Sequence, residues 1–224
     1  MRLKFLSNYW YYLALFGLIM MAFGSLNLFA ELSEDLLESE LENIDQMVRQ
    51  MVEHYHSPSL TSFFTVITEL GSTGFLTMLT TITVMVLLYK YKRWKEALAL
   101  IMVVGTCSIF TTVFKHLFQR QRPMEDPLID ATGYSFPSGH SVGSMAFYGF
   151  LIYLCLKMRL PHYWKMGISF FLGSVIVLVG FSRIYLEAHY LTDVLAGFSL
   201  GFFCLALVIL WSELSDWPKK KTAK

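Results

Sequence analysis

The chain has 224 residues, of which 55% are hydrophobic and only 16% are charged, and its formal net charge is +1. Soluble domains are usually about 45–50% apolar and about 25% charged. This balance excludes a disordered chain, a collagen and a disulfide scaffold, and it argues against a water-soluble globular protein. The near-neutral charge gives no indication of nucleic-acid binding, so we expect no nucleic-acid partner.

Six stretches of the sequence are long and apolar enough to cross a membrane. A bilayer core of about 30 Å needs roughly 20 apolar residues in a helix, and these stretches are free of charge except for Asp193 in the last one. They cover residues 9–30, 70–89, 97–114, 141–156, 166–182 and 190–211. We therefore predict an all-α, polytopic membrane protein with six transmembrane helices. The alternative, a soluble bundle of buried helices, fits neither their number nor their length.

The first stretch has features of a secretory signal peptide, because Arg2 and Lys4 precede it. Its apolar region is longer than the roughly 7–15 residues of a signal peptide. Leu28 stands two positions before Ala30, the best small residue near its end, and this makes a poor cleavage site. We therefore expect this stretch to be retained as a membrane anchor.

An amphipathic segment, residues 31–59, follows the first stretch. Between residues 33 and 55, apolar side chains recur at spacings of three and four, as on one face of a helix. Ser33 suits the N-cap of that helix, and Glu34 and Asp35 suit its first turn, where the helix dipole favours acidic side chains. We predict an extracytoplasmic amphipathic helix that lies along the membrane surface. Its role is either a structural brace or a lid that guides a lipid toward the site.

The basic residues indicate the orientation in the membrane. Cytoplasmic loops are enriched in Lys and Arg, and 18 such residues occur in the chain. Most lie in the N-terminal segment, in the tail and in the loops at residues 90–95 and 157–165. We therefore expect a plasma-membrane protein with both termini in the cytoplasm. The five basic residues on the outer side are Arg49, Lys115, Arg120, Arg122 and Arg183.

Three polar motifs lie at the predicted outer ends of the last four helices, at the same membrane depth. They are Lys115-x6-Arg122-Pro123, then Pro137-Ser138-Gly139-His140, and then Ser182-Arg183-x5-His189-x3-Asp193. Each motif alone is a weak signal. Their shared position indicates a single site within residues 115–193.

The basic residues and the second motif are suited to binding a small anion. Lys115 and Arg122 are seven residues apart, so they would share a helix face if the third helix continues that far. Ser138 and Gly139 begin a helix, whose free N–H groups and positive dipole end attract anions. Arg183 adds a planar guanidinium that matches phosphate oxygens. Together these residues predict a phosphate site.

The histidines are suited to phosphoryl chemistry. His189 and Asp193 are four residues apart, so they meet on one helical face. A carboxylate bound to one imidazole nitrogen fixes the tautomer and leaves the other nitrogen free to attack. His140 is then available as the acid that protonates the departing oxygen.

At every signature position the three motifs resemble those of the type-2 phosphatidic acid phosphatase (PAP2) superfamily. Within it, the chain is similar to small bacterial membrane members that act on phosphatidylglycerophosphate or undecaprenyl diphosphate. The resemblance implies one phosphatase domain over residues 1–224 and a metal-independent reaction through a phosphohistidine. It also implies that His189 is the nucleophile, Asp193 its orienting partner and His140 the acid. The residues implied to bind phosphate are Lys115, Arg122, Ser138, Gly139, His140 and Arg183.

We therefore expect a membrane enzyme that hydrolyses the phosphate or diphosphate of a bilayer lipid at the outer face. We expect no cofactor, no metal and no obligate protein partner. A lipid phosphotransferase would use the same phosphohistidine and pass the phosphate to an alcohol. A vanadium haloperoxidase would use a similar pocket, but those relatives are soluble. A non-catalytic lipid-binding or transport protein fits the complete set of histidines and aspartate less well.

Overall fold

The structure, a computed structural model, describes residues 2–38, 41–123 and 133–222. Within these ranges the chain forms helices and no strand, which confirms the all-α fold class. The elements are α1 (Arg2–Glu38), α2 (Glu42–Glu53), α3 (Pro58–Glu69), α4 (Thr73–Met85), the π-helical turn η1 (Val86–Lys90), α5 (Trp94–Phe118), α6 (Gly139–Lys157), α7 (His162–Tyr185) and α8 (Leu191–Thr222).

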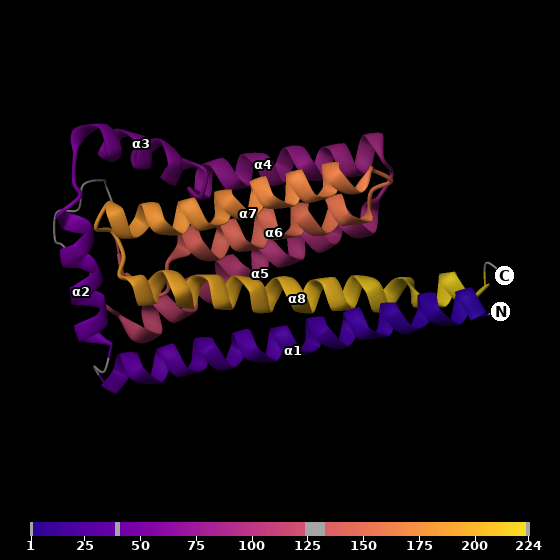
Figure 1. Ribbon diagram of the computed structural model, residues 1–224, viewed down its shortest axis with the longest axis horizontal. Coiled ribbons are helices and arrows are strands. Elements are labelled where there is room, and N and C mark those ends of the chain that lie inside the picture. Colours follow the sequence, from indigo (N-terminus) through magenta and orange to yellow (C-terminus); the bar gives the residue numbers. More distant parts are fainter. Residues whose placement is uncertain (1, 39–40, 124–132, 223–224) are drawn as a thin grey trace.

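Six helical segments of the described residues are long and apolar enough to cross a membrane, and they run along the long axis of the molecule (Figure 1). They are Tyr11–Glu38, Thr73–Lys90, Trp94–Phe118, Gly139–Lys157, His162–Tyr185 and Leu191–Ser215. Each overlaps one predicted stretch, so the predicted number and order of the transmembrane helices is confirmed. The chain is a multi-pass membrane protein.

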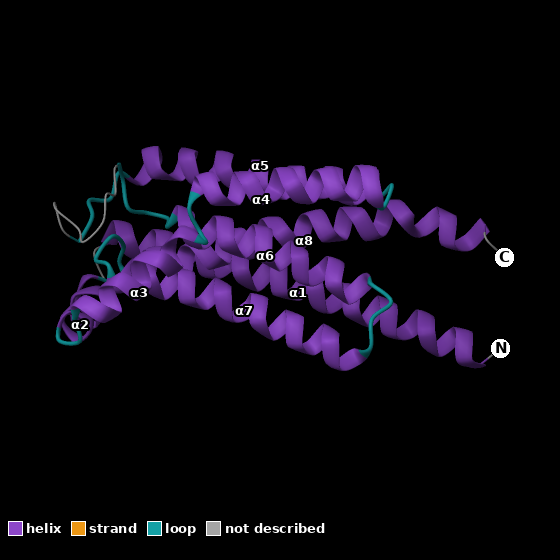
Figure 2. Cartoon of the chain, turned by 90° about the horizontal axis from the view of Figure 1, so that it is seen from above, coloured by secondary structure: helices purple, strands orange, loops and turns teal. Residues whose placement is uncertain are grey.

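The two ends of the bundle differ in character. The described ends of α1 and α8 nearest the chain termini lie at one end, and α2 lies at the opposite end in both views (Figures 1 and 2). Figure 1 also shows that α2 runs across the bundle axis. Because α5 and α7 run toward the α2 end, and α6 and α8 begin there, all three polar motifs fall at that end. The helix directions therefore gather the predicted site residues in one layer.

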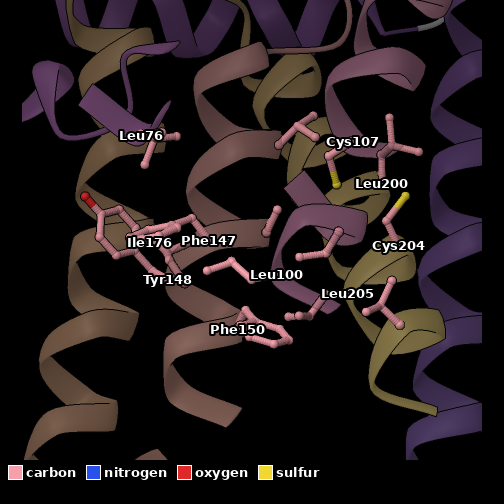
Figure 3. Packing of buried hydrophobic residues seen from close by; sticks show 14 of the residues in the cluster. Leu76, Leu100, Cys107, Phe147, Tyr148, Phe150, Ile176, Leu200, Cys204 and Leu205 are labelled. Atoms are coloured by element: carbon pink, nitrogen blue, oxygen red, sulfur yellow. The ribbon is translucent and has the colours of Figure 1, made fainter. Parts of the chain in front are cut away.

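α6 and α8 form the centre of the bundle. In the most apolar part of each span, 50% of the α6 residues and 56% of the α8 residues are buried, compared with 11% in α1. Phe147 and Phe150 of α6 pack in one cluster with Leu100 of α5 and Leu205 of α8 (Figure 3). The helix that carries the second motif at its start is thus held on several sides by its neighbours.

Two glycines allow α6 and α8 to approach closely. A Cβ atom at Gly197 would lie 2.8 Å from the carbonyl oxygen of Ser138, and one at Gly201 would lie 2.8 Å from the carbonyl oxygen of Val142. Both neighbours are backbone atoms, which cannot move aside without shifting a helix. The spacing of four residues is the small-residue pattern by which membrane helices pack. The contact at Gly197 also sets how far Ser138 lies from α8.

The predicted amphipathic helix over residues 33–55 has the wrong boundaries. α1 continues past Ser33, whose hydroxyl donates to the carbonyl of Phe29 (2.7 Å) and therefore does not cap a new helix. The separate helix α2 covers only Glu42–Glu53. The physical reason is that Glu and Leu, which dominate the last turns of α1, favour a helix, so α1 does not end where the apolar run ends. Residues 39 and 40 lie outside the described residues.

The helix α3 has no counterpart among the predicted elements. The Ser57 hydroxyl accepts a hydrogen bond from the N–H of Leu60 (3.4 Å), and Pro58 occupies the first turn. This Ser-Pro pair is a helix-start signal that the sequence displays. α3 packs against α7, and a short turn joins it to α4. The end of α3 therefore comes to lie beside the third motif.

We expect Gly201→Ala to destabilise the protein by about 1–3 kcal/mol, because the added methyl group would overlap the α6 backbone. Gly173→Ala in α7 is the matched control, since the space around Gly173 is open and alanine is favoured over glycine in a helix. Thermal unfolding in detergent should give a lower midpoint only for Gly201→Ala. Equal midpoints for Gly201→Ala and the wild type would show that the α6–α8 contact is not tight.

Candidate active site

The three polar motifs meet at the α2 end of the bundle. The second and third motifs are joined directly, because the N–H of Ser138 donates to the carbonyl of Asp193 (3.0 Å). His140 lies close enough to interact electrostatically with residues of the other two motifs, and these are Lys115, Arg122, Arg183 and His189. The structure therefore brings all the predicted site residues into one region.

Lys115 and Arg122 do not share a helix face, contrary to the prediction. α5 ends at Phe118, because Gln119 adopts a left-handed conformation (φ 48°) that closes the helix. Arg122 then follows in the loop. The ammonium of Lys115 donates to the carbonyl of Tyr134 in the segment that leads to α6 (2.8 Å). The two cations thus approach the site from a helix and from a turn.

Arg122 reaches the third motif from this loop. Its Nη1 atom donates to the carbonyl of Ala188 (2.6 Å) and lies 3.3 Å from Nε2 of His189. Its Nε atom donates to the carbonyl of Gly133 (2.9 Å). Burial lowers the pKa of Arg122, while Asp193 opposes this shift, and an arginine remains charged at neutral pH. A cation therefore faces the Nε2 edge of His189.

The start of α6 provides the second motif. Ser138 is the fully buried N-cap residue, and its hydroxyl accepts a hydrogen bond from Ser141 (3.1 Å). Its N–H is bonded to Asp193, so the prediction that this donor is free for an anion is wrong. The donors available to an anion are those of Gly139 and the following residues, which the first turn of a helix leaves without internal partners.

Gly71, in the turn between α3 and α4, makes room for the imidazole of His140. A Cβ atom at Gly71 would lie 3.3 Å from Cδ2 of that imidazole and would overlap the side chain of Val179. A larger residue in this turn would therefore displace His140 or α7. The unpredicted α3–α4 corner thus forms one wall of the site.

Arg183 is almost fully buried near the end of α7, with 3% of its surface exposed. Its Nη1 atom donates to the hydroxyl of Thr68 at the end of α3 (2.8 Å). Its Nε atom is buried and has no hydrogen-bond partner among the described residues. A buried donor without a partner costs free energy, and a bound phosphate oxygen would remove that cost.

A turn after α7 places His189. The N–H groups of Ala188 and His189 both donate to the carbonyl of Arg183 (3.1 Å each). The N–H of Glu187 donates to the carbonyl of Ile184 (3.0 Å), which completes a Schellman motif. Glu187 holds the left-handed position of this motif (φ 55°), where glycine is usual. The turn thereby fixes the backbone of His189 against the end of α7.

The prediction that His189 and Asp193 meet on one helical face is wrong. They meet across the start of α8. α8 begins at Leu191, so His189 precedes it. The Oδ2 atom of Asp193 accepts the N–H of Tyr190 (2.9 Å), which is one half of a capping box. The same oxygen lies 3.4 Å from Nδ1 of His189. The expected contact therefore forms through a different local geometry.

The imidazole of His189 is neutral at neutral pH. Burial lowers the pKa of His189 to about 3, although Asp193 opposes this shift, whereas an ordinary histidine has a pKa of about 6.5. A neutral imidazole carries one proton and one lone pair. Because Nδ1 faces the Asp193 carboxylate, the proton belongs on Nδ1 and the lone pair on Nε2.

Two residues outside the predicted set belong to this region. Arg120 donates from Nη1 to Oδ1 of Asp193 (2.7 Å) and from Nη2 to Oδ2 of Asp45 in α2 (2.7 Å). Its guanidinium also lies 4.1 Å from the ring centre of Tyr190. The sequence displays one signal for Arg120, which is its place among the few basic residues on the predicted outer side. Asp45 offers no such signal, because it is one more acid in an acidic segment.

Two hollows adjoin the site. One, of about 500 Å³, lies beside α1, α2 and α5, and its lining includes Asp45, Arg120 and Tyr190. A smaller hollow is lined in part by His189 and Arg49. Within the described residues, no group of three or more His, Cys, Asp or Glu side chains is placed to hold a metal ion.

Residues 96–217 match the PAP2 superfamily. Phosphatidylglycerophosphatase B of Bacillus subtilis (strain 168) is 35% identical over 170 residues, which are 75% of this chain and 83% of that protein. The crystal structure of the first transmembrane PAP2 type phosphatidylglycerolphosphate phosphatase from Bacillus subtilis has a TM-score of 0.80 and 32% identity, covering 86% of this chain and 96% of that chain. Aquifex aeolicus LpxE shares the fold, with a TM-score of 0.59 and 22% identity over 73% of this chain and 93% of that chain. The chain therefore belongs to the PAP2 superfamily.

Proposed function

We propose that this PAP2 membrane protein hydrolyses the phosphate or diphosphate of a bilayer lipid, with His189 as the nucleophile. The observation that carries the proposal is the different partner of each ring nitrogen. Nδ1 lies 3.4 Å from Asp193, and Nε2 lies 3.3 Å from Arg122. The ring proton is held on the anionic side, and the lone pair points to the cationic side, where a phosphate would bind.

In the first proposed step, Nε2 of His189 attacks phosphorus, and the bond from phosphorus to the lipid oxygen breaks. His140 gives its proton to that oxygen. The imidazole now carries the phosphoryl group and a positive charge, which Asp193 balances. Fixed cations and N–H donors stabilise the charge that spreads over the equatorial oxygens. The residues proposed for this role are Lys115, Arg122, Gly139 and Arg183, together with the hydroxyl of Ser138, whose N–H is already bonded to Asp193.

In the second proposed step, a water molecule attacks phosphorus. His140, which has lost its proton, accepts one from this water, and the bond from phosphorus to Nε2 breaks. Inorganic phosphate leaves, and His189 returns to its neutral form. If a lipid alcohol replaced the water, the same intermediate would give a phosphotransferase.

A lipid is the proposed substrate because of where the site lies. The three motifs lie at one end of a bundle of helices long and apolar enough to cross a membrane, and the ends of such helices are where lipid headgroups meet a membrane protein. Phosphatidylglycerophosphate is our first candidate, because the Bacillus subtilis relative at 35% identity is named for its hydrolysis. Undecaprenyl diphosphate, for which a lipid monophosphate would be the leaving group, is the second.

We propose that the α2 end faces outward and that both termini are cytoplasmic in the plasma membrane. The support is the basic composition of the segments at the other end. One of these basic residues, Lys224, lies outside the described residues. The native cysteines Cys107, Cys155 and Cys204 are buried, so they do not interfere with labelling.

A membrane-impermeant maleimide applied to intact cells should label Glu53→Cys, at the exposed end of α2, and should not label Lys92→Cys in the exposed loop after η1. Permeabilised cells should show both labels, which controls for reactivity. The reverse pattern in intact cells would place the site in the cytoplasm.

The purified wild type should release phosphate from phosphatidylglycerophosphate in detergent, with EDTA present, because the proposed step uses no metal. His189→Ala should lower the rate of phosphate release by about 10³-fold or more, because no other group replaces the nucleophile. His54→Ala, an exposed histidine after α2, is the matched control and should keep full activity. Full activity of His189→Ala would refute the proposed nucleophile.

The same assay separates the remaining alternatives. Comparing kcat/KM for phosphatidylglycerophosphate and undecaprenyl diphosphate in one detergent ranks the two substrates. Trapping of an acid-labile phosphoenzyme in the wild type, followed by addition of water or a lipid alcohol, distinguishes the hydrolase from the phosphotransferase. Absence of phosphate release from every lipid phosphate would leave the non-catalytic alternative.

The depressed pKa of His189 predicts that its imidazole stays neutral between pH 8 and about pH 4. ¹⁵N-histidine NMR in detergent, with the His189 signal assigned from its loss in His189→Ala, should show no titration in this range, whereas a histidine peptide titrates at about pH 6.5. In the unfolded chain His189 binds this proton at about pH 6.5, and in the folded chain only at about pH 3, so His189 lowers the stability of the fold as the pH falls between these values. A His189 midpoint near 6.5 would contradict the prediction.

A further inference from the structure

Arg120 lies between two buried carboxylates, each from a different element. Its Nη1 atom donates to Oδ1 of Asp193 and its Nη2 atom to Oδ2 of Asp45, both at 2.7 Å. Asp193 has no exposed surface, and Asp45 has 1%. Although burial opposes a charged guanidinium, Asp193 and Asp45 together raise the pKa of Arg120. The three groups therefore form a charged chain from α2 to the start of α8.

Asp45 is fixed independently of Arg120. Its Oδ1 atom accepts the N–H of Thr192 (3.1 Å), and its Oδ2 atom accepts the hydroxyl of the same residue (2.6 Å). That hydroxyl oxygen also accepts a hydrogen bond from Nη1 of Arg120 (2.8 Å). The side chain of Asp45 thus links α2 to the first turn of α8 by several hydrogen bonds. Its partner Thr192 directly precedes Asp193, the residue that faces His189.

This arrangement sets the direction of the Asp193 carboxylate. Oδ1 is held by Arg120, and Oδ2 accepts the N–H of Tyr190 (2.9 Å) and faces Nδ1 of His189. A carboxylate held at both oxygens cannot rotate about its terminal bond without breaking one of these contacts. Loss of Arg120 would free Oδ1 and leave two buried anions without their shared cation, which is costly.

The charges of these three linked side chains also matter for phosphoryl transfer. Asp45, Arg120 and Asp193 carry a net charge of −1, and the imidazole of His189 becomes positive once it is phosphorylated. If Asp45 lost its charge, Arg120 would neutralise Asp193, and the site would hold the cationic imidazole less well. Asp45 therefore compensates the positive charge of Arg120, so that the three groups keep a net negative charge beside His189.

We propose that Arg120 is a positioning residue that orients the carboxylate of Asp193 toward His189. Asp45 holds Arg120 in place, and through this contact α2 contributes to the reaction. The proposal rests on the proposed function of His189 for its kinetic consequences. It assigns α2 a role in the chemistry, beyond that of a brace on the bundle.

Asp45→Asn is the sharpest test, because it keeps the shape of the side chain and removes its charge. We expect kcat to fall by about 10- to 100-fold through misplacement of Asp193, with KM within about threefold, because the cations that bind phosphate are unchanged. Glu53→Gln is the matched control, an acid-to-amide change at an exposed position of the same helix, and should keep both constants. Thermal unfolding of each variant in detergent shows whether it is folded.

Arg120→Ala and Arg120→Lys test the contact between Arg120 and Asp193. Both should lower kcat, and Lys should restore little, because one ammonium cannot replace the two-armed contact with both carboxylates. In an Asp193→Asn background, Arg120→Ala should reduce kcat by less than threefold, because Arg120 acts through Asp193. Equal losses of kcat in both backgrounds would overturn the proposal.

A readout that needs no activity separates this proposal from the proposed function. In ¹⁵N-histidine NMR, the wild type should hold the His189 proton on Nδ1, and folded Asp45→Asn should show a mixture with the Nε2 tautomer. This shift would support the positioning role even if no lipid phosphate is hydrolysed. An unchanged tautomer together with unchanged kcat in folded Asp45→Asn would refute it, as would a loss of activity that matches only the loss of folded protein.

Discussion

The carboxylate of Asp193 has no exposed surface at the start of α8, and a charge buried to this extent must be met by donors from its surroundings. These groups come from two segments: Arg120 follows α5 and donates from its guanidinium, and the turn before α8 supplies the N–H of Tyr190 and, with Nδ1 at 3.4 Å, the imidazole of His189. To supply them, the end of α5, the turn after α7 and the start of α8 have to converge. The layout of the site follows from the need to satisfy this one group.

The packing of the bundle and the geometry of the site depend on each other. Gly197 lets α8 approach the carbonyl of Ser138, and the N–H of Ser138 donates to the carbonyl of Asp193. The helix start proposed to bind phosphate is therefore held against the first turns of α8, which directly follow the proposed nucleophile. At the α2 end of the bundle, Asp45 of α2 closes the same region through Arg120. The bundle core and the short crossing helix α2 are thus joined through Arg120, which binds both Asp193 and Asp45.

The transmembrane helices were predictable because a bilayer demands long uncharged runs, and hydropathy reports those runs directly. Their ends were less predictable. α1 extends beyond its apolar run to Glu38, since helix propensity does not stop at the first charge. α5 stops before Arg122, because Gln119 adopts a left-handed conformation, which a glutamine does not indicate in the sequence. The turn before His189 uses Glu187 at a position where glycine is the usual signal. The extension of α1 follows local helix propensity, whereas the two left-handed residues have side chains that give no signal of that conformation.

The sequence by itself determined the membrane class, the number and order of the spans, and the three motifs at one predicted depth, because these depend on composition, periodicity and spacing along the chain. It also pointed to His189 and Asp193 as partners, although through a helical face that does not exist. Only the tertiary structure decided that they meet across the start of α8, and that Asp45 joins them through Arg120. The reason is physical: Asp45 and Asp193 are brought together by the burial of their shared cation, and nothing along the chain records which distant charges will share a buried space.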